Sequence, residues 1–344
     1  MYITSLTLQE LEEKVKQIGW EHYRTEQILN WIYKRFVLDF EKMTNLSKEQ
    51  RAFLKDNYLI HSLELLKVVE APDSKKFLFK TRDRHILETV LIYERDHLTI
   101  CVSSQIGCAV GCTFCATAKD GLVRNLRVEE IIDQFLQVQS LTKDKIRNVV
   151  FMGMGEPLAN YENVRKAVEI MVSPWGLDLS KRRVSISTSG LINQLKRMAQ
   201  DPLMRELNLA VSINAPFQSL RESLMPLSKT NTLEELLGVL YSFPYPPDRR
   251  IMIEYVLIHG VNDKVEHAKE LARLLKKGRK KFKVNLIPFN PDPELPYRRS
   301  PTENVYRFQK VLWEEGISTF IRISKGVELF GACGQLRSKR LVLR

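Results

Sequence analysis

The chain has 344 residues, 44% of them hydrophobic, which suits one large domain and a small accessory one. It has no apolar stretch near the roughly 20 residues of a membrane-spanning helix and no secretory signal at its N-terminus, so we expect a cytoplasmic protein without a membrane partner. Lys and Arg outnumber Asp and Glu by 12, an excess that fits either a polyanionic partner or a generally solvated basic surface.

Residues 1–70 are expected to form a helical accessory domain. Apolar residues recur at helical spacing over 8–18 and again over 28–36. Ser47 and Gln50 have the spacing of a capping box at the start of a third helix. Three short helices predict a compact module with little chemistry of its own.

The pattern changes to strands in a β extension over 71–96 and then to an alternation of strands and helices. Strands are expected at 147–152, 183–188, 207–213, 251–258, 282–288 and 318–323, with helices such as 163–172, 232–242, 263–277 and 303–315. This alternation predicts right-handed βαβ units and a parallel sheet. With the strand before Cys108 there are six or seven units, which predicts an α/β fold with a partial (β/α)6 TIM-like barrel over 97–323 and a C-terminal segment over 324–344.

Three cysteines in the run CAVGCTFC carry the strongest chemical signal. Cys108, Cys112 and Cys115 have the spacing C-x3-C-x2-C, and three thiolates in one loop can hold a 4Fe–4S cluster while one iron stays open. The alternative is a zinc site with Cys101 as fourth ligand, although structural zinc sites usually pair two C-x2-C knuckles that lie farther apart. The spacing, directly after an apolar strand, resembles the signature of the radical S-adenosylmethionine (radical SAM) superfamily.

Polar residues and glycines follow successive strands of the expected barrel. They are Gly155 and Glu156 in FMGMGEP, Ser187, the segment Ser212, Ile213 and Asn214, and Asn290 in IPFNP. For each of them alone, local capping of a helix or loop is the more common role. Because the functional groups of parallel barrels gather where strands end, their recurrence favours a shared ligand.

Two further cysteines and one acid are candidates for catalysis. Cys333 in GACGQL has small neighbours, which favours an accessible nucleophilic thiol over a buried cysteine. Cys101 ends a strand and is either a core residue or within reach of Cys333. Glu88 lies in the apolar run HILETVLIY, either as an exposed residue of an edge strand or as a proton acceptor turned toward the site.

The whole chain resembles the RlmN family of dual-specificity RNA methyltransferases. The motifs that carry the resemblance occur in the family's order: ETVLIYERDHLTICVSSQIGCAVGCTFCATAKDGLVRNL, FMGMGEPLANY, KRRVSISTSG, SLMPL, HGVND, VNLIPFNP and ACGQL. The resemblance implies radical SAM enzymes that methylate C2 of an adenosine in the peptidyl-transferase centre of 23S rRNA and of the adenosine 3′ of the anticodon in tRNA. The related Cfr enzymes methylate C8 of the same ribosomal adenosine. Cfr-type proteins tend to have Ala where Pro157 follows Glu156, which favours C2 here.

The resemblance also implies roles for the candidate residues. Cys108, Cys112 and Cys115 would bind one 4Fe–4S cluster, and Gly155, Glu156, Ser187, Ser212, Ile213, Asn214 and Asn290 would contact S-adenosylmethionine (SAM). Cys333 would carry the methyl group, Cys101 would resolve the RNA–protein adduct, and Glu88 would accept a proton. Each turnover would use two SAM molecules and an electron from a flavodoxin- or ferredoxin-like donor. The enzyme would act as a monomer on 23S rRNA and tRNA, with residues 1–70 as an RNA-binding domain.

The number of cysteines matches this chemistry. C2 of adenine has neither a lone pair nor an acidic proton, so a radical is required to methylate it. Three cysteines for the cluster and two for methyl transfer account for all five in the chain. The alternatives are a Cfr-like C8 methyltransferase, a non-catalytic zinc- and RNA-binding protein, and a radical SAM activase, which would not need Cys333.

Two further features bear on substrate binding. The run SKGVELFGACGQL departs from the more acidic stretch of the family at Val327, Phe330 and Gly331, which changes the loop that carries Cys333. Basic clusters at 181–183 and 276–283, and a third formed by Arg337, Lys339, Arg340 and Arg344, can contact RNA phosphates. For any one cluster, a solvated surface explains the pattern as well.

Overall fold

A parallel sheet forms the centre of the molecule. The computed structural model describes residues 1–246 and 248–337, and within them the main sheet has ten strands in the order β1-β2-β3-β4-β7-β8-β9-β10-β11-β12. The parallel strands are β4 (Leu98–Cys101), β7 (Ile146–Phe151), β8 (Val184–Thr188), β9 (Asn208–Ser212), β10 (Ile251–Leu257), β11 (Phe282–Pro288) and β12 (Thr319–Ile321). Every strand expected over 147–323 is present within two residues of its expected ends.

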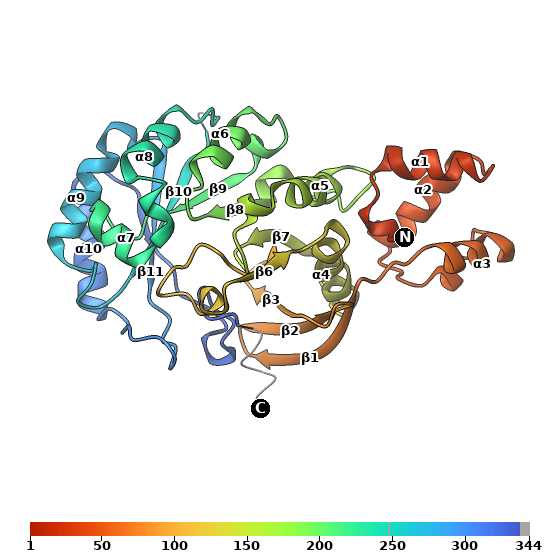
Figure 1. The fold of residues 1–344 in the computed structure, drawn as a ribbon, viewed down its shortest axis with the longest axis horizontal. Helices are drawn as coiled ribbons and strands as arrows, with labels where there is room; N and C mark the ends of the chain where they lie inside the picture. Colours follow the sequence, from red (N-terminus) through yellow and green to blue (C-terminus); the bar gives the residue numbers. More distant parts are fainter. Residues whose placement is uncertain (247, 338–344) are drawn as a thin grey trace.

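Helices connect these strands and cover the outside of the sheet (Figure 1). They are α4 (Val128–Ser140), α5 (Tyr161–Val172), α6 (Ile192–Gln200), α7 (Gln218–Leu224), α8 (Leu233–Ser242), α9 (Val265–Leu275) and α10 (Thr302–Glu314). This architecture confirms the predicted partial (β/α)6 barrel, with β12 as a short additional strand. Among the described residues, no helix has the length and apolar content needed to cross a membrane.

The strands of the barrel are apolar on both faces, as expected for a parallel sheet covered by helices. β10 reads IMIEYVL and buries Ile251, Ile253 and Tyr255. Glu254 in the middle of this run is also buried, which is unusual for a carboxylate and marks the strand as part of a site.

The first helices form a module at one side of the barrel, at the right of Figure 1. α1 (Leu8–Gln17) and α2 (Tyr23–Leu29) come first, and α2 continues into a π-helix over 30–34. α3 (Lys48–Asn57) begins with the capping box that Ser47 and Gln50 predict. The carboxylate of Asp133 in α4 then accepts the backbone N–H groups of Ser62 and Leu63 at 2.7 and 2.9 Å, which fixes the end of the module to the barrel.

An antiparallel extension follows and begins earlier than the sequence predicts. β1 (Leu63–Ala71), β2 (Ser74–Thr81) and β3 (Ile86–Tyr93) pair in antiparallel fashion, and β3 pairs with β4 through Val90 and Cys101. The boundary expected at residue 70 therefore falls inside β1. The β-branched Val68 and Val69, which favour strand over helix, pair with β2 in this strand.

A short two-stranded ribbon closes the loop of the three cysteines. β5 (Gln105–Gly107) pairs with β6 (Leu122–Asn125), and the N–H of Cys108 donates to the carbonyl of Gly121 at 2.9 Å. Gly107 has φ +74°, and a Cβ at this position would lie 1.9 Å from the carbonyl oxygen of Gly121. Only glycine allows the two ends of the loop to meet this closely.

We therefore expect Gly107→Ala to lower the free energy of unfolding by about 3 kcal/mol, through backbone strain and steric overlap together. Chemical denaturation measures the effect. Gly19→Ala is a matched control, because Gly19 also has φ +74° but nothing lies within 4 Å of its added Cβ. The control should lose only about 1 kcal/mol, and an equal loss in both variants would show that the close approach in the cysteine loop is unimportant.

Candidate active site

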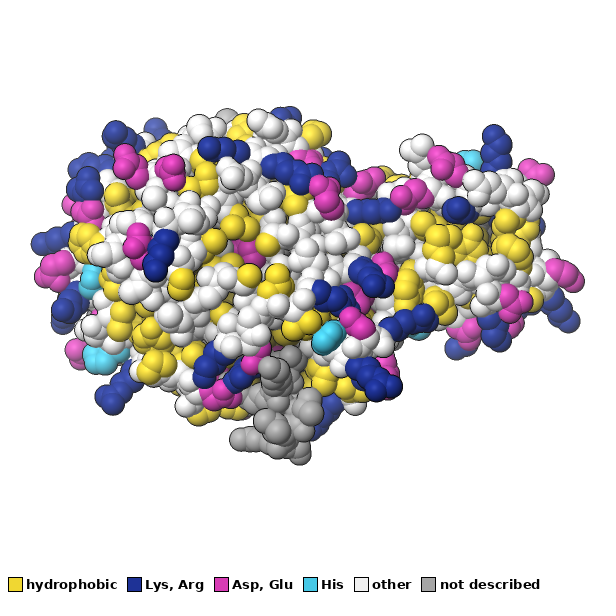
Figure 2. Space-filling view, in the orientation of Figure 1, with side chains coloured by type: hydrophobic (Ala, Val, Ile, Leu, Met, Phe, Trp, Pro, Cys, Tyr) yellow, Lys and Arg dark blue, Asp and Glu magenta, His cyan; other side chains and the backbone are white. Residues whose placement is uncertain are grey.

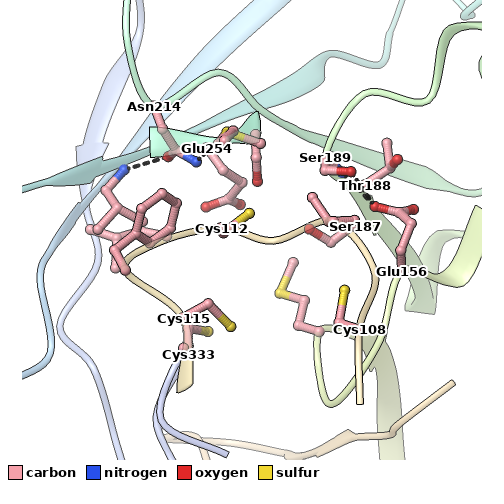
Figure 3. Close-up of a pocket in the computed structure, with 18 of the residues that line it drawn as sticks. Cys108, Cys112, Cys115, Glu156, Ser187, Thr188, Ser189, Asn214, Glu254 and Cys333 are labelled. Atoms are coloured by element: carbon pink, nitrogen blue, oxygen red, sulfur yellow. Dashed lines mark hydrogen bonds between the residues drawn. The ribbon is translucent and has the colours of Figure 1, made fainter. Parts of the chain in front are cut away.

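A cavity of about 170 Å³ lies at the carboxyl ends of the parallel strands (Figure 3). Ten residues predicted from the sequence line it: Cys108, Cys112, Cys115, Gly155, Glu156, Ser187, Ser212, Asn214, Asn290 and Cys333. Three predicted residues lie elsewhere. Ile213 packs in the hydrophobic core, Cys101 lines a neighbouring cavity, and Glu88 lies beneath the C-terminal segment.

The three cysteines of the loop face one space but are not arranged for a single ion. Among the described residues, no three Cys, His, Asp or Glu side chains are close enough together to bind one metal ion. Three cysteine thiolates on one short loop are the kind of ligand set that iron–sulfur clusters use. Burial raises the pKa of all three thiols, that of Cys108 to about 12, so metal binding must displace their protons. The donor set fits a 4Fe–4S cluster.

Glu156 is a buried acceptor in the loop that follows β7, where it caps a short 3-10 helix (Figure 3). One carboxylate oxygen accepts the backbone N–H and the hydroxyl of Ser189, both at 2.7 Å, and the other accepts the N–H of Leu158 at 3.1 Å. Burial raises the pKa of Glu156, and these hydrogen bonds oppose the rise because they favour the charged form. Gly155 precedes it with φ +101°, and a Cβ there would lie 2.5 Å from Gln105. The arrangement suits a cationic amine close to the backbone.

Two asparagines border the other side of the cavity. Asn214 has φ +58°, and its side-chain oxygen accepts the N–H of Val256 at 2.8 Å. The amide nitrogen of Asn290 donates to the carbonyl of Cys333 at 3.1 Å. The buried oxygen of Asn290 has no hydrogen-bond partner among the described residues. An unpaired acceptor at a cavity fits a ligand with a hydrogen-bond donor.

Arg221 in α7 is a residue that the sequence did not reveal. Its fully buried guanidinium donates to the carbonyls of Ser189 and Ser212 at 2.9 and 3.3 Å and to that of Asn231 at 3.1 Å. Burial lowers its pKa to about 10. Because a charged helical residue usually faces solvent, its run RESLMPL gives no sign that it joins the ends of β8 and β9.

We expect Arg221→Met to lower the free energy of unfolding by about 3 kcal/mol, because a side chain of similar size leaves buried carbonyls without donors. Urea denaturation measures the change. Arg197→Met is the control: Arg197 is exposed and makes an ion pair with Glu162, so its loss should cost less than about 1 kcal/mol. Equal losses would mean that Arg221 does not stabilise the strand ends.

Glu254 and Arg322 also line the cavity and were not predicted. One oxygen of Glu254 accepts the side-chain amide of Asn285 at 3.0 Å, and the other is buried without a hydrogen-bond partner among the described residues. Cys333 and then Glu254 raise the pKa of Arg322, because negative charge nearby favours the guanidinium. A buried acid in β10 and a polar residue after β12 were the available signals.

The pKa of Glu254 predicts a pH-dependent stability. Burial raises it above the usual 4.5, with Arg322 opposing the rise. The folded protein thus favours the protonated form, so the contribution of Glu254 is full below about pH 4.5 and is lost as the pH rises through the folded pKa. We expect Glu254→Gln to melt above the parent protein at about pH 8 and level with it at about pH 4. Calorimetry measures this, and a difference independent of pH would contradict it.

Cys101 and Cys333 share a second, smaller cavity of about 30 Å³. Cys333 and Arg322 line both cavities, so the C-terminal thiol faces the three-cysteine loop on one side and Cys101 on the other. Burial, and then the nearby Cys333, raise the pKa of Cys101 to about 12. Cys101 is therefore both a buried strand residue and a neighbour of Cys333, the two possibilities that its sequence position left open.

The segment that carries Cys333 is fastened to the cysteine loop. The carbonyl of Gly334 accepts the N–H of Ala116 at 2.7 Å, and that of Leu336 accepts the hydroxyl of Thr117 at 2.6 Å. Phe330, one of the departures from the family pattern, has the left-handed φ of +49° at the end of a 3-10 helix over Val327–Leu329. The bases Lys339, Arg340 and Arg344 lie outside the described residues.

Glu88 is buried in β3, between β2 and β4, so it is not an exposed residue of an edge strand. One carboxylate oxygen accepts the backbone N–H of Arg337 at 3.0 Å, and the other lies 3.3 Å from the ammonium of Lys76. It lines neither cavity, and in this arrangement it anchors the C-terminal segment.

Known proteins match this chain along its whole length. Residues 2–60 match the ribosomal RNA large subunit methyltransferase N-terminal domain, and residues 102–275 match the radical SAM superfamily. A probable dual-specificity RNA methyltransferase RlmN of Aquifex aeolicus is 66% identical over 100% of this chain and 99% of its own length. That of Thermotoga maritima is 41% identical over 99% of each.

A solved structure of a radical SAM methyltransferase from Sphaerobacter thermophilus has a TM-score of 0.93 and 41% identity, and covers 98% of this chain and 99% of its own. The fold, the cysteine loop and these similarities all point to the same family. The chain belongs to the RlmN family of radical SAM RNA methyltransferases.

Proposed function

We propose that this enzyme methylates C2 of adenosine in 23S rRNA and in tRNA through a methyl group carried on Cys333. The observation that supports this most directly is the position of Cys333, which lines both the cavity of the three-cysteine loop and the cavity of Cys101. The dual-specificity names of the relatives support two RNA substrates.

The cavity residues have roles in holding SAM. Cys108, Cys112 and Cys115 hold the cluster, which when bound supplies the electron that cleaves SAM to a 5′-deoxyadenosyl radical. Glu156 accepts hydrogen bonds from the ammonium group of SAM. The unpaired oxygen of Asn290 accepts one from the adenine amine, and Ser187, Ser212 and Asn214 border the ribose and carboxylate.

The two thiols of Cys333 and Cys101 transfer the methyl group, and Glu88 accepts a proton. The Cys333 thiolate displaces S-adenosylhomocysteine from a first SAM molecule and becomes S-methylated. The 5′-deoxyadenosyl radical would take a hydrogen atom from this methyl group, and the methylene carbon would then bond to C2 of adenine. The adduct would give up one electron to the oxidised cluster and its C2 proton to Glu88. The Cys101 thiolate would then attack the Cys333 sulfur, so that a disulfide forms and the released methylene carbon takes up a proton to become the methyl group of the RNA. Because Glu88 holds the N–H of Arg337, its role as proton acceptor requires the C-terminal segment to shift.

Incubation of anaerobically reconstituted protein with SAM, a chemical reductant and an rRNA fragment tests the proposal. Nucleoside chromatography should show 2-methyladenosine, and a parallel reaction with tRNA should show it as well. A product that elutes with 8-methyladenosine would identify a Cfr-like enzyme. If the protein consumes SAM but the RNA contains no methylated adenosine, RNA methylation is refuted.

A further inference from the structure

The net positive charge of the chain is absent from the N-terminal module. Residues 1–60 contain nine Lys or Arg and nine Asp or Glu, so their formal charge is zero. Figure 2 shows both signs interspersed over the module at the right of the view. The excess of 12 positive charges therefore lies in the rest of the chain, and the module as a whole adds no net charge to it.

Exposed bases gather instead at the edge of the barrel opposite the active site. They precede or begin the parallel strands: Lys143, Lys145 and Arg147 at β7, Arg182 and Arg183 at β8, Arg250 at β10, and Lys276, Lys277, Arg279 and Lys280 at β11. We call these ten residues the basic edge. Since amino ends of parallel strands share one edge, it lies about 20 Å from the cysteine loop, the length of a six-residue strand.

Contacts between strand ends make the basic edge continuous. The guanidinium of Arg183 donates to the side chain of Asn148 at 3.1 Å, which joins the starts of β7 and β8. The side chain of Asn208 donates to the carbonyl of Arg182 at 2.6 Å and continues the edge to β9. The N–H of Ile251 donates to the carbonyl of Lys281 at 2.9 Å and joins β10 to β11.

Few acids neutralise this edge. Arg182 pairs with Asp248, and Lys276 lies 3.7 Å from Glu315. Among the residues that the structure describes, no ion pair involves the other eight bases of the basic edge. Their charge is available to an external anion.

A cavity of about 390 Å³ lies at one end of the basic edge, between the N-terminal module and the barrel. Four bases line it, Lys34 and Arg35 from the module and Lys143 and Lys145 from the barrel, together with the aromatic ring of Phe36. Burial, and then the Lys145 ammonium, lower the pKa of Lys34, although Asp178 at 3.8 Å opposes them. The described residues that line the cavity include no Asp or Glu, and among described residues only Lys34 of the four bases pairs with an acid, Asp178. A bound anion would therefore relieve the repulsion among the other three cations.

We propose that this cavity and the basic edge bind the phosphates of an RNA helix at a distance from the target adenosine. The inference rests on the proposed action on RNA. It assigns to the enzyme a second, sequence-independent contact that anchors a large RNA while its target enters the active site. A recessed cavity between two parts of the protein suits a phosphate ridge better than a flat lipid surface.

A double variant, Lys143→Gln with Lys145→Gln, tests the anchor. Its control is Lys196→Gln with Lys269→Gln, which removes two exposed lysines without ion pairs from α6 and α9. Binding of an RNA duplex without the target adenosine is measured by fluorescence anisotropy across a salt series. The cavity variant should bind the duplex at least about tenfold more weakly. The slope of its plot of log K against log salt concentration should be smaller in magnitude by about 2. The control should bind within about twofold of the parent protein.

Methylation kinetics separate anchoring from catalysis. The cavity variant should raise KM for a large rRNA fragment without changing kcat, and should leave both unchanged for a short hairpin around the target. Equal weakening of duplex binding in the control, or a loss of kcat on the hairpin, would overturn the proposal. A cavity variant that binds the duplex as the parent protein does, but binds phosphatidylglycerol vesicles more weakly, would overturn it as well. Should the parent protein methylate no RNA, the proposed function fails, while duplex binding still decides the anchor.

Discussion

Cys333→Ala should abolish RNA methylation while the protein still binds iron and cleaves SAM. Cys333 lines the cavity but lies in a different segment from the three-cysteine loop, so its loss should remove the methyl carrier and leave the cluster ligands in place. We expect product below about one thousandth of the parent level, because no other described thiol faces both cavities. Chromatography of nucleosides and of 5′-deoxyadenosine from the same reaction measures both outcomes.

Cys101→Ala is the matched control for this experiment. It removes the thiol on the far side of the small cavity, so Cys333 should still accept a methyl group and mass spectrometry should detect RNA linked to the protein. Methylation by Cys333→Ala at the parent level would favour a radical SAM activase that has no need of a carrier thiol.

Cys112→Ala should remove the cluster and with it all SAM cleavage. Loss of one of three thiolates leaves two ligands, and the remaining thiols, whose pKa values burial raises, favour their protonated forms. We expect anaerobically reconstituted protein to contain less than about a tenth of the iron of the parent protein, with loss of its brown absorbance. Iron and sulfide assays measure this directly.

The fold of this variant should persist, because Cys112 is only partly buried and belongs to a small cluster of apolar residues apart from the main core. Circular dichroism checks that. Iron content equal to that of the parent protein would mean that Cys112 is not a required ligand of the cluster.

The sequence predicts the barrel well because its strands are short apolar runs separated by turn residues. It does not show how α4 is buried. Val128, Ile131, Ile132 and Phe135 recur at helical spacing, but the polar residues between them are buried as well. Asp133 and Gln134 within α4 are buried because they bind backbone and side-chain groups of neighbouring segments, and a sequence pattern does not show such partners.

The residues of the site also divide into those that the sequence predicts and those that it does not. Residues at strand ends were predictable because parallel strands bring their carboxyl ends together, and six of them meet at one cavity with the three cysteines of the loop and Cys333. Arg221 was not predictable, because a charged residue of a helix usually faces solvent. Glu254 interrupts an apolar strand and Arg322 follows one, but these positions alone did not show that their side chains face the cavity. Glu88 shows the limit of a resemblance, since its predicted role requires a movement away from its contacts with Lys76 and Arg337.

The docking of the C-terminal segment has a consequence for maturation of the enzyme. Its hydrogen bonds to Ala116 and Thr117 lie directly after Cys115, and Asn290 holds the carbonyl of Cys333. Insertion of iron and sulfide at the three thiols therefore takes place directly beside these hydrogen bonds. We expect the protein with and without its cluster to differ in how firmly the segment that carries Cys333 is held.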